Sequence, residues 1–251
     1  MNQFSRNLLS IGKAGQEILA QSSVAILGLG GVGSYACEAI SRSGVGKIIL
    51  IDKDKVDITN INRQLHATLD TIGQSKVELM AKRILSINTQ CQIETHEIFF
   101  DFTTYEEILS SKIDFFIDAS DTITYKILLI KECLKRKIPF ISVMGTANKL
   151  DPTLFRIDDI RNTCYDPIAK VIRLKLRKEK ITGSVPVVYS QERPLKSKYE
   201  EYDGPTSEIT RKSQYPPASN SFVPPVAGFI AAGYAIRNLL KDINFERDGE
   251  S

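Results

Sequence analysis

The chain has 251 residues, of which 42% are hydrophobic and 25% are charged, and its formal net charge is +3. A chain of this size and composition buries one sizeable core, which predicts one large domain with room for a small second lobe rather than a multidomain assembly. The charge and the pI of about 8.5 are compatible with an anionic substrate but exclude a histone-like or ribosomal protein.

The sequence also bears on metal binding, compartment and membranes. Cys37, Cys91, Cys133 and Cys164 include no C-x-x-C pair, which argues against zinc and predicts free thiols in a reducing, cytoplasmic compartment. No charged start followed by an apolar run is seen at the N-terminus, so no signal peptide is expected. The apolar segment 222–236 is shorter than the roughly 20 residues of a membrane span. We expect a buried C-terminal helix there and no membrane association.

The first part of the chain alternates apolar strands with helical patterns. An apolar, β-branched run at 22–27 precedes a glycine cluster, residues 35–44 have helical spacing, and residues 47–52 form a second buried run. The expected elements that follow are a helix over 75–88, strands over 92–100 and 113–120, a helix over 124–137 and a strand over 138–145. This order predicts a Rossmann-like, doubly wound and mostly parallel α/β sheet with its ligand at the carboxyl ends of the strands.

Beyond Gly145 the pattern becomes less regular. We therefore predict a nucleotide-binding core over residues 1–150 and a smaller, irregular substrate-side lobe over residues 151–251. Within this lobe the polar, proline- and charge-rich residues 190–219 are predicted to form a mobile loop. The C-terminal helix is predicted to pack back on the core.

A glycine cluster stands between the first strand and the first helix after it. Gly28, Gly30, Gly31 and Gly33 let backbone N–H groups and a helix N-terminus meet phosphate oxygens with no side chain between them. Asp52 ends the next strand, where a carboxylate is placed to accept hydrogen bonds from ribose hydroxyls. These two features predict a nucleotide site without deciding which nucleotide binds.

The polar segment after Asp52 is more cationic than a dinucleotide site requires. Asn60, Arg63 and Lys76 lie where the loop and the next helix should return to the glycine turn. Two cations there would cover phosphates beyond the first and stabilise charge on a pyrophosphate leaving group. No G-K-[ST] follows the glycines, so the site is not a P-loop.

Two aspartates, Asp118 and Asp121, stand at the carboxyl end of a later strand. One can cap the following helix, and the other can hold a magnesium ion between phosphate oxygens, because this hard cation prefers oxygen ligands. We expect Asp121 to bind the metal and Asp118 to be structural.

In this order and spacing, the segments GLGGVG, IDKDKVDITNINRQ, TIGQSKVELM and DASDT resemble the ubiquitin-activating-type adenylation family, whose bacterial members include ThiF, MoeB and HesA. These enzymes use ATP to convert a carboxylate into an acyl-adenylate, releasing pyrophosphate. The resemblance implies that Asp52 binds the ribose and that Asn60, Arg63 and Lys76 contact the triphosphate. It implies that Asp121 is the magnesium-linked catalytic aspartate.

The resemblance extends to both ends of the chain. Arg6 in QFSRNLL matches an N-terminal arginine that reaches the ATP of the opposite subunit, which implies a homodimer. The segments GTANKLDPTLFRIDDI, TCYDPIAKVIRLKLRKEKI, VPVVYSQERP and PPASNSFVPPVAGFIAAGYAIRNLL resemble the branch of the family that acts on threonylcarbamoyladenosine in tRNA. That branch activates the threonyl carboxylate next to the anticodon and closes it into a ring with loss of water.

Residues 170–180 are rich in Lys and Arg, and Lys170, Arg173 and Arg177 recur at helical spacing. Such a stripe fits an RNA backbone, although a charge run by itself is more often a solvated helix face. Lys149 is expected on the substrate side, where a role in holding carboxylate or phosphate and a structural role are equally weighted.

Two other functions stay open at this point. Activation of a ubiquitin-like sulfur-carrier protein ending in Gly-Gly is disfavoured by the missing zinc cysteines, and a non-catalytic sensor of ATP or NAD is disfavoured by Arg6, Arg63, Lys76 and Asp121 together. No catalytic cysteine is expected, and His66 and His96 show no partner spacing. The sequence leaves undecided whether a monovalent cation or a sulfur-relay protein binds.

Overall fold

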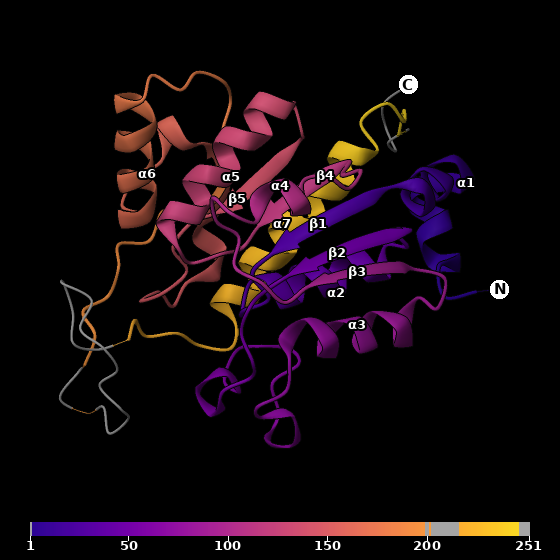
Figure 1. Ribbon diagram of the computed structural model, residues 1–251, viewed down its shortest axis with the longest axis horizontal. Helices are drawn as coiled ribbons and strands as arrows, with labels where there is room; N and C mark the ends of the chain where they lie inside the picture. Colours follow the sequence, from indigo (N-terminus) through magenta and orange to yellow (C-terminus); the bar gives the residue numbers. More distant parts are fainter. Residues whose placement is uncertain (1, 199–200, 202–215, 246–251) are drawn as a thin grey trace.

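The computed structural model describes residues 2–198, 201 and 216–245. In these residues a seven-stranded sheet lies between two layers of helices (Figure 1), with strand order β3-β2-β1-β4-β5-β7-β6. All neighbouring strands are parallel except β6 and β7, which pair antiparallel at one edge. This confirms the predicted mostly parallel, Rossmann-like sheet. Residues 199–200 and 202–215 of the predicted mobile loop lie outside the described residues.

The elements have the following bounds. The strands are β1 (Ser23–Leu27), β2 (Lys47–Ile51), β3 (Gln92–His96), β4 (Phe115–Asp118), β5 (Phe140–Val143), β6 (Phe155–Asp159) and β7 (Pro186–Ser190). The α-helices are α1 (Ser5–Gln21), α2 (Gly33–Arg42), α3 (Lys76–Ile87), α4 (Tyr105–Ile108), α5 (Ile123–Arg136), α6 (Pro167–Lys178) and α7 (Val223–Leu239). Short 3-10 turns are η1 (Ile58–Asn60), η2 (Leu69–Thr71), η3 (Pro152–Leu154) and η4 (Ile160–Asn162).

Two hydrophobic cores cover the two faces of the sheet. Helices α1, α2, α3 and α7 pack on one face, and α4, α5 and α6 pack on the other (Figure 1). Val24 and Ile26 of β1 belong to the first core, whereas Ala25 and Leu27 belong to the second, because successive side chains of a strand point to opposite faces. Every β1 residue is buried, as a parallel strand covered on both faces requires.

The predicted C-terminal helix is α7, which packs against α2 and against strands β4, β5 and β7. Pro224 and Pro225 lie in its first turn, where the missing N–H groups have no helical acceptor. Gly228 lies close to the start of α2, because a Cβ atom there would lie 2.3 Å from the carbonyl oxygen of Val32. Of the helices that the structure describes, none is long and apolar enough to cross a membrane.

We expect Gly228→Ala to lower the free energy of unfolding by about 1–3 kcal/mol, because the added methyl group forces α7 away from α2. Urea denaturation measures this loss. Gly233→Ala in the same helix is the control: its Cβ would meet only the Arg237 guanidinium, at 3.6 Å, and Ala favours a helix more than Gly does. Equal losses in both variants would contradict a close α2–α7 contact.

Candidate active site

The glycine turn joins β1 to α2 at the carboxyl end of the sheet. Gly28 has a φ of +85°, and a Cβ atom there would lie 2.8 Å from the carbonyl oxygen of Ala119. A Cβ atom on Gly33 would lie 1.8 Å from the carbonyl oxygen of Gly28. Both contacts exclude any larger residue. Gly30 and Gly31 complete the turn, so bare backbone leads into the N-terminus of α2, where an anion binds favourably.

Asp52 follows β2 and is buried beside this turn. Its Oδ2 accepts a hydrogen bond from Leu29 N at 2.6 Å, and its Oδ1 accepts one from Asp54 N at 2.8 Å. Burial raises the pKa of Asp52, and the Lys76 ammonium opposes this shift. The carboxylate therefore ties the glycine turn to the end of β2, and its unused lone pairs can accept ribose hydroxyls.

The segment between β2 and α3 returns to the glycine turn, as predicted. Asn60 is fixed within η1, where its Oδ1 accepts a hydrogen bond from Asp57 N at 3.2 Å. Arg63 follows η1 and donates from Nη1 to Thr59 O at 2.7 Å. The Arg63 Cγ lies 3.2 Å from the position that a Cβ of Gly31 would take. The guanidinium stem therefore packs directly on the glycine turn.

Lys76 is the first residue of α3, and its side chain is buried. Its Nζ forms an ion pair with Asp54 Oδ2 at 3.2 Å, and its charge also acts on Asp52. The ammonium therefore pairs with Asp54 and lies near the Asp52 carboxylate. The sequence analysis did not find Asp54, because one acid in the cluster DKDKVD has no distinguishing spacing.

Asp121 lies in the turn between β4 and α5, and its carboxylate is exposed. The Thr122 hydroxyl lies 3.3 Å from its Oδ1, and no ion pair to Asp121 is found within the described part of the chain. Burial lowers the pKa of Arg63, and the negative charge of Asp121 opposes this effect. The structure thus brings Asp121 and Arg63 to the same site with opposite charges.

Asp118 is fully buried and joins four parts of the fold. Its Oδ2 accepts hydrogen bonds from Lys126 Nζ of α5 at 3.1 Å and from the Ser142 hydroxyl of β5 at 2.6 Å. Its Oδ1 accepts hydrogen bonds from the Ser120 amide at 3.1 Å and the Ser120 hydroxyl at 2.7 Å. These contacts agree with the expected structural role of Asp118. They also hold the turn that leads to Asp121.

An aromatic pair that the sequence analysis missed lies beside Lys53, the residue that follows Asp52. Phe99 and Tyr125 meet edge to face with ring centroids 6.1 Å apart, and Lys53 Nζ lies 4.6 Å from the Phe99 centroid. Phe99 is partly exposed. Lys53 directly follows Asp52, so this aromatic surface lies near the Asp52 carboxylate, and an apolar surface of this kind suits a nucleobase.

Lys149 is buried near the carboxyl end of β5 and donates from Nζ to Glu192 O at 2.9 Å. Burial lowers its pKa, and the charges of Asp166 and Glu192 oppose that shift. Asp166 accepts a hydrogen bond from Gly145 N at 3.0 Å and caps α6 through Ala169 N at 2.9 Å. Lys149 thus lies between the end of the sheet and the start of α6.

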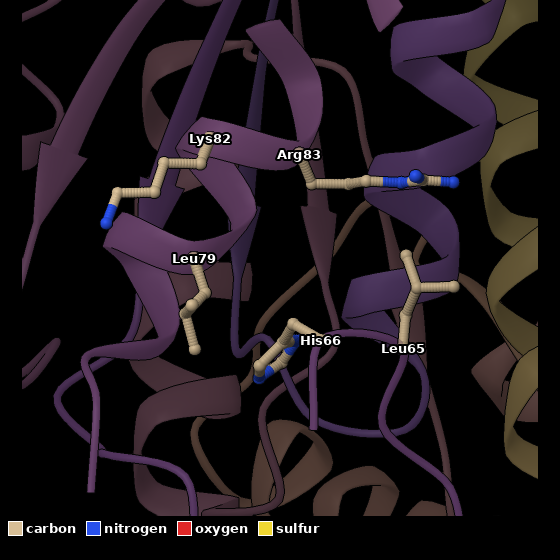
Figure 2. Close-up of a pocket in the computed structure, with 5 residues that line it drawn as sticks. All are labelled: Leu65, His66, Leu79, Lys82 and Arg83. Atoms are coloured by element: carbon tan, nitrogen blue, oxygen red, sulfur yellow. The ribbon is translucent and has the colours of Figure 1, made fainter. Parts of the chain in front are cut away.

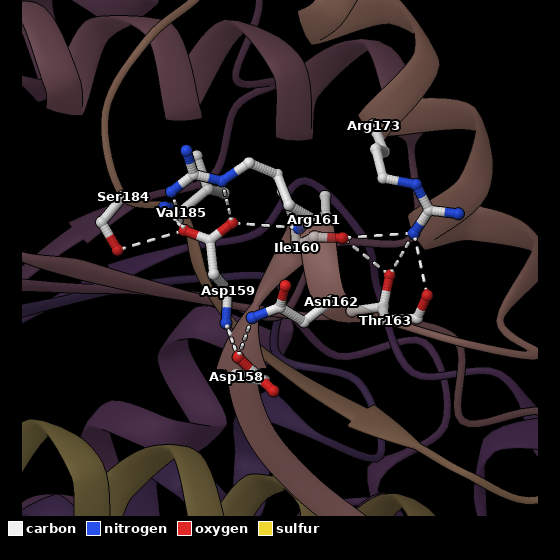
Figure 3. A network of polar contacts seen from close by, with 9 residues as sticks. All are labelled: Asp158, Asp159, Ile160, Arg161, Asn162, Thr163, Arg173, Ser184 and Val185. Carbon is white, nitrogen blue, oxygen red and sulfur yellow. Dashed lines mark hydrogen bonds and ion pairs between the residues drawn. The ribbon is translucent and has the colours of Figure 1, made fainter.

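The predicted basic stripe lies on α6, but its members differ in their contacts. Lys170 and Arg177 are exposed. Arg173 donates from Nη1 to Ile160 O at 3.2 Å and to Thr163 O at 3.0 Å, as Figure 3 shows. One end of the Arg173 guanidinium therefore holds the η4 segment in place, whereas Lys170 and Arg177 are exposed to solvent.

Arg6 is exposed on α1, away from the other predicted site residues. Helix α1 contacts the C-terminal end of α2, through Asn7 Nδ2 to Arg42 O at 3.0 Å and Gln16 Nε2 to Ser43 O at 3.0 Å. The glycine turn lies at the opposite end of α2, roughly 15 Å away along a ten-residue helix (Figure 1). Within one chain, Arg6 therefore does not meet Arg63 or Asp121.

A hollow of about 470 Å³ lies between α3 and the segment of Leu65 and His66. Figure 2 shows His66 at one end of it, flanked by Leu65 and Leu79, with Lys82 and Arg83 at the other end. His66 is buried, and its two ring nitrogens have no hydrogen-bond partner among the described residues. Burial and the nearby Lys76 charge lower its pKa to about 4, so the ring is neutral at pH 7.

Comparison with known proteins places these features in context. Residues 4–247 match the model of the ThiF family. The chain is 55% identical over 249 residues to the tRNA threonylcarbamoyladenosine dehydratase of Bacillus subtilis (strain 168), covering 98% of each sequence. It is 31% identical over 244 residues to the Escherichia coli (strain K12) protein of the same name, covering 91% of this chain and 90% of that one.

A solved structure agrees with these sequence matches. The fold is similar to the crystal structure of E. coli tRNA N6-threonylcarbamoyladenosine dehydratase, TcdA, in complex with ATP, with a TM-score of 0.85 and 30% identity. The similarity covers 96% of this chain and 94% of that one. A complex of the same E. coli protein with AMP matches equally well, with a TM-score of 0.85.

We expect Lys126→Met to lower the free energy of unfolding by about 3–5 kcal/mol, because it leaves the Asp118 carboxylate buried without its cation. Urea denaturation measures the change. Lys131→Met in the same helix is the matched control, because the Lys131–Glu179 pair is partly exposed and such pairs contribute about 0–1 kcal/mol. Asp118→Asn combined with Lys126→Met should recover part of the loss. Equal effects at Lys126 and Lys131 would contradict this account.

His66 should make the fold sensitive to acid. The unfolded chain takes up a proton at His66 below about pH 6.5, whereas the folded chain does so only near pH 4. The stability contribution is therefore complete above pH 6.5 and is lost as the pH falls towards 4, by about 3 kcal/mol in total. Unfolding free energies of the wild type and His66→Phe, measured from pH 7 to 4.5, should diverge with the wild type falling faster. Parallel curves would contradict the assignment.

Proposed function

The chain belongs to the ThiF family, and from this premise we propose that it is an ATP-dependent tRNA threonylcarbamoyladenosine dehydratase. The reaction adenylates the carboxylate of the threonylcarbamoyl group and then closes the ring with loss of water. The observation that carries the proposal is the convergence of Asp52, Arg63, Lys76 and Asp121 around the glycine turn. This arrangement lies in a chain that aligns over 98% of its length with a dehydratase of that name.

Different site residues bind different parts of the ATP molecule. Asp52 accepts the ribose hydroxyls, and the Phe99–Tyr125 surface beside it takes the base. The glycine turn and the N-terminus of α2 bind phosphate oxygens through backbone N–H groups. Asn60, Arg63 and Lys76 contact the triphosphate, where the two cations stabilise the charge that moves onto pyrophosphate.

Asp121 is proposed as the ligand that links magnesium to ATP. Within the described ranges, no three His, Cys, Asp or Glu side chains gather to form a metal site of their own. A magnesium ion bound between phosphate oxygens needs only one or two protein carboxylates, and the exposed Asp121 carboxylate at the strand end fits that requirement. When bound, the ion supplies positive charge to the phosphate oxygens. No zinc takes part in the proposed mechanism.

The chain has two chemical tasks in this reaction. It first aligns the threonyl carboxylate with the α-phosphorus, so that an acyl-adenylate forms and pyrophosphate leaves. A nucleophile of the substrate itself then attacks the acyl carbon, and AMP departs with the oxygen that the carboxylate loses. No enzyme thiol is required, and Cys164, the cysteine nearest to α6, is assigned no covalent role.

The basic face of α6 is proposed to bind tRNA. Lys170 and Arg177 contact phosphates, Arg173 adds charge while bracing the η4 segment, and Lys149 holds the substrate carboxylate. Lys149 already donates one hydrogen bond to Glu192 O, but an ammonium group has further donors. The alternative substrate, a ubiquitin-like sulfur carrier ending in Gly-Gly, would have no need of this basic helix.

A homodimer is part of the proposal, with Arg6 acting in the active site of the opposite subunit. Arg6 is exposed and lies at the far end of α2 from its own glycine turn, so it can reach phosphates only in trans. Two partly exposed apolar side chains support a second copy: Phe222 precedes α7, and Phe229 within α7 packs on Tyr35 with centroids 5.7 Å apart. We also propose that the protein is cytoplasmic. A monovalent cation and a sulfur-relay partner do not enter the mechanism.

Pyrophosphate release tests which substrate is activated. With ATP and magnesium, tRNA that carries threonylcarbamoyladenosine should stimulate release, whereas the same tRNA without the modification should not. A small carrier protein ending in Gly-Gly serves as the competing substrate. Stimulation by the carrier protein alone would contradict the dehydratase assignment and favour the alternative.

We expect Asp121→Ala to lower turnover by about 100- to 1000-fold or more while leaving ATP affinity within a few-fold, because its charge is needed at the reacting phosphates. Arg63→Ala should weaken ATP binding itself. Calorimetric ATP titration and pyrophosphate release measure the two effects separately. Asp70→Ala, an exposed aspartate in η2, is the control and should behave as wild type. Unchanged turnover in Asp121→Ala would remove its catalytic assignment.

A further inference from the structure

Tyr165 stands in an unusual turn directly before α6. Its φ is 54°, and Asp166 N donates to Cys164 O at 2.7 Å, which closes a three-residue turn centred on Tyr165. Turns of this kind with a left-handed central residue are rare and strained when that residue is not glycine. The side chain is 52% exposed, so no core packing accounts for a large aromatic residue there.

The ring of Tyr165 is paired with a cation from a distant segment. The guanidinium carbon of Arg193, which follows β7, lies 4.7 Å from the ring centroid. This is the geometry of a cation–π contact, and Arg193 is itself exposed. Both residues are exposed, so an aromatic ring and a guanidinium cation stand together at the surface.

This surface adjoins the proposed substrate lysine. Tyr165 immediately precedes Asp166, which binds Gly145 N after β5, and Arg193 immediately follows Glu192, whose carbonyl oxygen accepts Lys149 Nζ. Strand β5 is the direct neighbour of β4, which leads to Asp121. The Tyr165–Arg193 pair thus lies at the same end of the sheet as the adenylation residues.

The chemistry of this pair suits an unpaired nucleobase. Bases in single-stranded RNA loops stack on aromatic rings and on arginine planes, whereas bases in a duplex are already stacked. Lys170 of α6 follows Tyr165 by five residues, Arg177 follows Lys170 by seven, and both are exposed. They can bind the adjoining phosphates. An aromatic surface next to a phosphate-binding stripe is what a single-stranded loop requires.

We infer that Tyr165 and Arg193 form a stacking platform for an unpaired base of the tRNA, which holds the modified loop beside Lys149. The inference rests on the proposed function, because that function supplies the RNA ligand. It assigns Tyr165 to substrate recognition and gives it no part in ATP binding.

RNA binding by purified full-length variants tests the platform. The probe is a fluorescent anticodon stem-loop RNA, and a fully paired duplex of the same length is the reference ligand. Tyr165→Ala should weaken stem-loop binding by about 5- to 100-fold, whereas Tyr165→Phe, which keeps the ring, should stay within about twofold of wild type. Arg193→Ala should weaken binding in the same direction. For Tyr165→Ala, duplex affinity and ATP affinity should not change.

Tyr105→Ala is the matched control, because Tyr105 of α4 also pairs with an arginine, Arg136, at 6.0 Å but has no part in the proposed tRNA surface. It should bind the stem-loop as wild type does. Normal stem-loop binding by Tyr165→Ala, or an equal loss for stem-loop and duplex, would overturn the platform while leaving the proposed function intact. A wild-type protein that binds and modifies no tRNA would overturn both.

Discussion

The buried pair of Asp118 and Lys126 is the interaction on which the site depends. The exposed fractions of the two side chains are 0% and 1%, so neither charge can exchange its partner for water, and removal of either leaves the other unpaired. Through the same carboxylate, Ser142 joins β5 to β4, and Ser120 fixes the turn towards Asp121. One acid therefore sets the positions of two strands, a helix and the turn that leads to Asp121.

A second contact fixes the glycine turn against the segment that leads from β4 to Asp121. Gly28 lies so close to the Ala119 carbonyl that a single added carbon would meet it at 2.8 Å, and Ala119 is held by the hydrogen bond from its amide to Leu27 O at 2.8 Å. The glycine turn and the turn that carries Asp121 thus pack directly against each other. The proposed substrate-binding residues Asp121, Lys170 and Tyr165, by contrast, are exposed and lie outside this rigid centre.

Sequence patterns predicted the parts of this structure that have a periodic or punctuated signal. Buried β-branched runs separated by helical spacing are typical of a parallel sheet covered on both faces, and the glycines and Asp52 mark its ligand end. The edge strand β6 was not predicted, because its residues Phe155–Asp159 alternate with charges and its pairing with β7 is set by tertiary contact. Lys126 was missed because one lysine in a helix normally faces solvent, and only the fold shows that Asp118 lies beside it. The resemblance supplied Arg6, which no local pattern could assign.

Mass spectrometry of nucleosides tests the central claim most directly. Purified protein is incubated with ATP, magnesium and tRNA that carries threonylcarbamoyladenosine, and the tRNA is then digested. The account predicts that the modified nucleoside loses the mass of one water molecule, and that omission of ATP prevents this loss. An unchanged nucleoside, with ATP binding and the starting modification both verified, would contradict the dehydratase function and direct attention to a protein substrate.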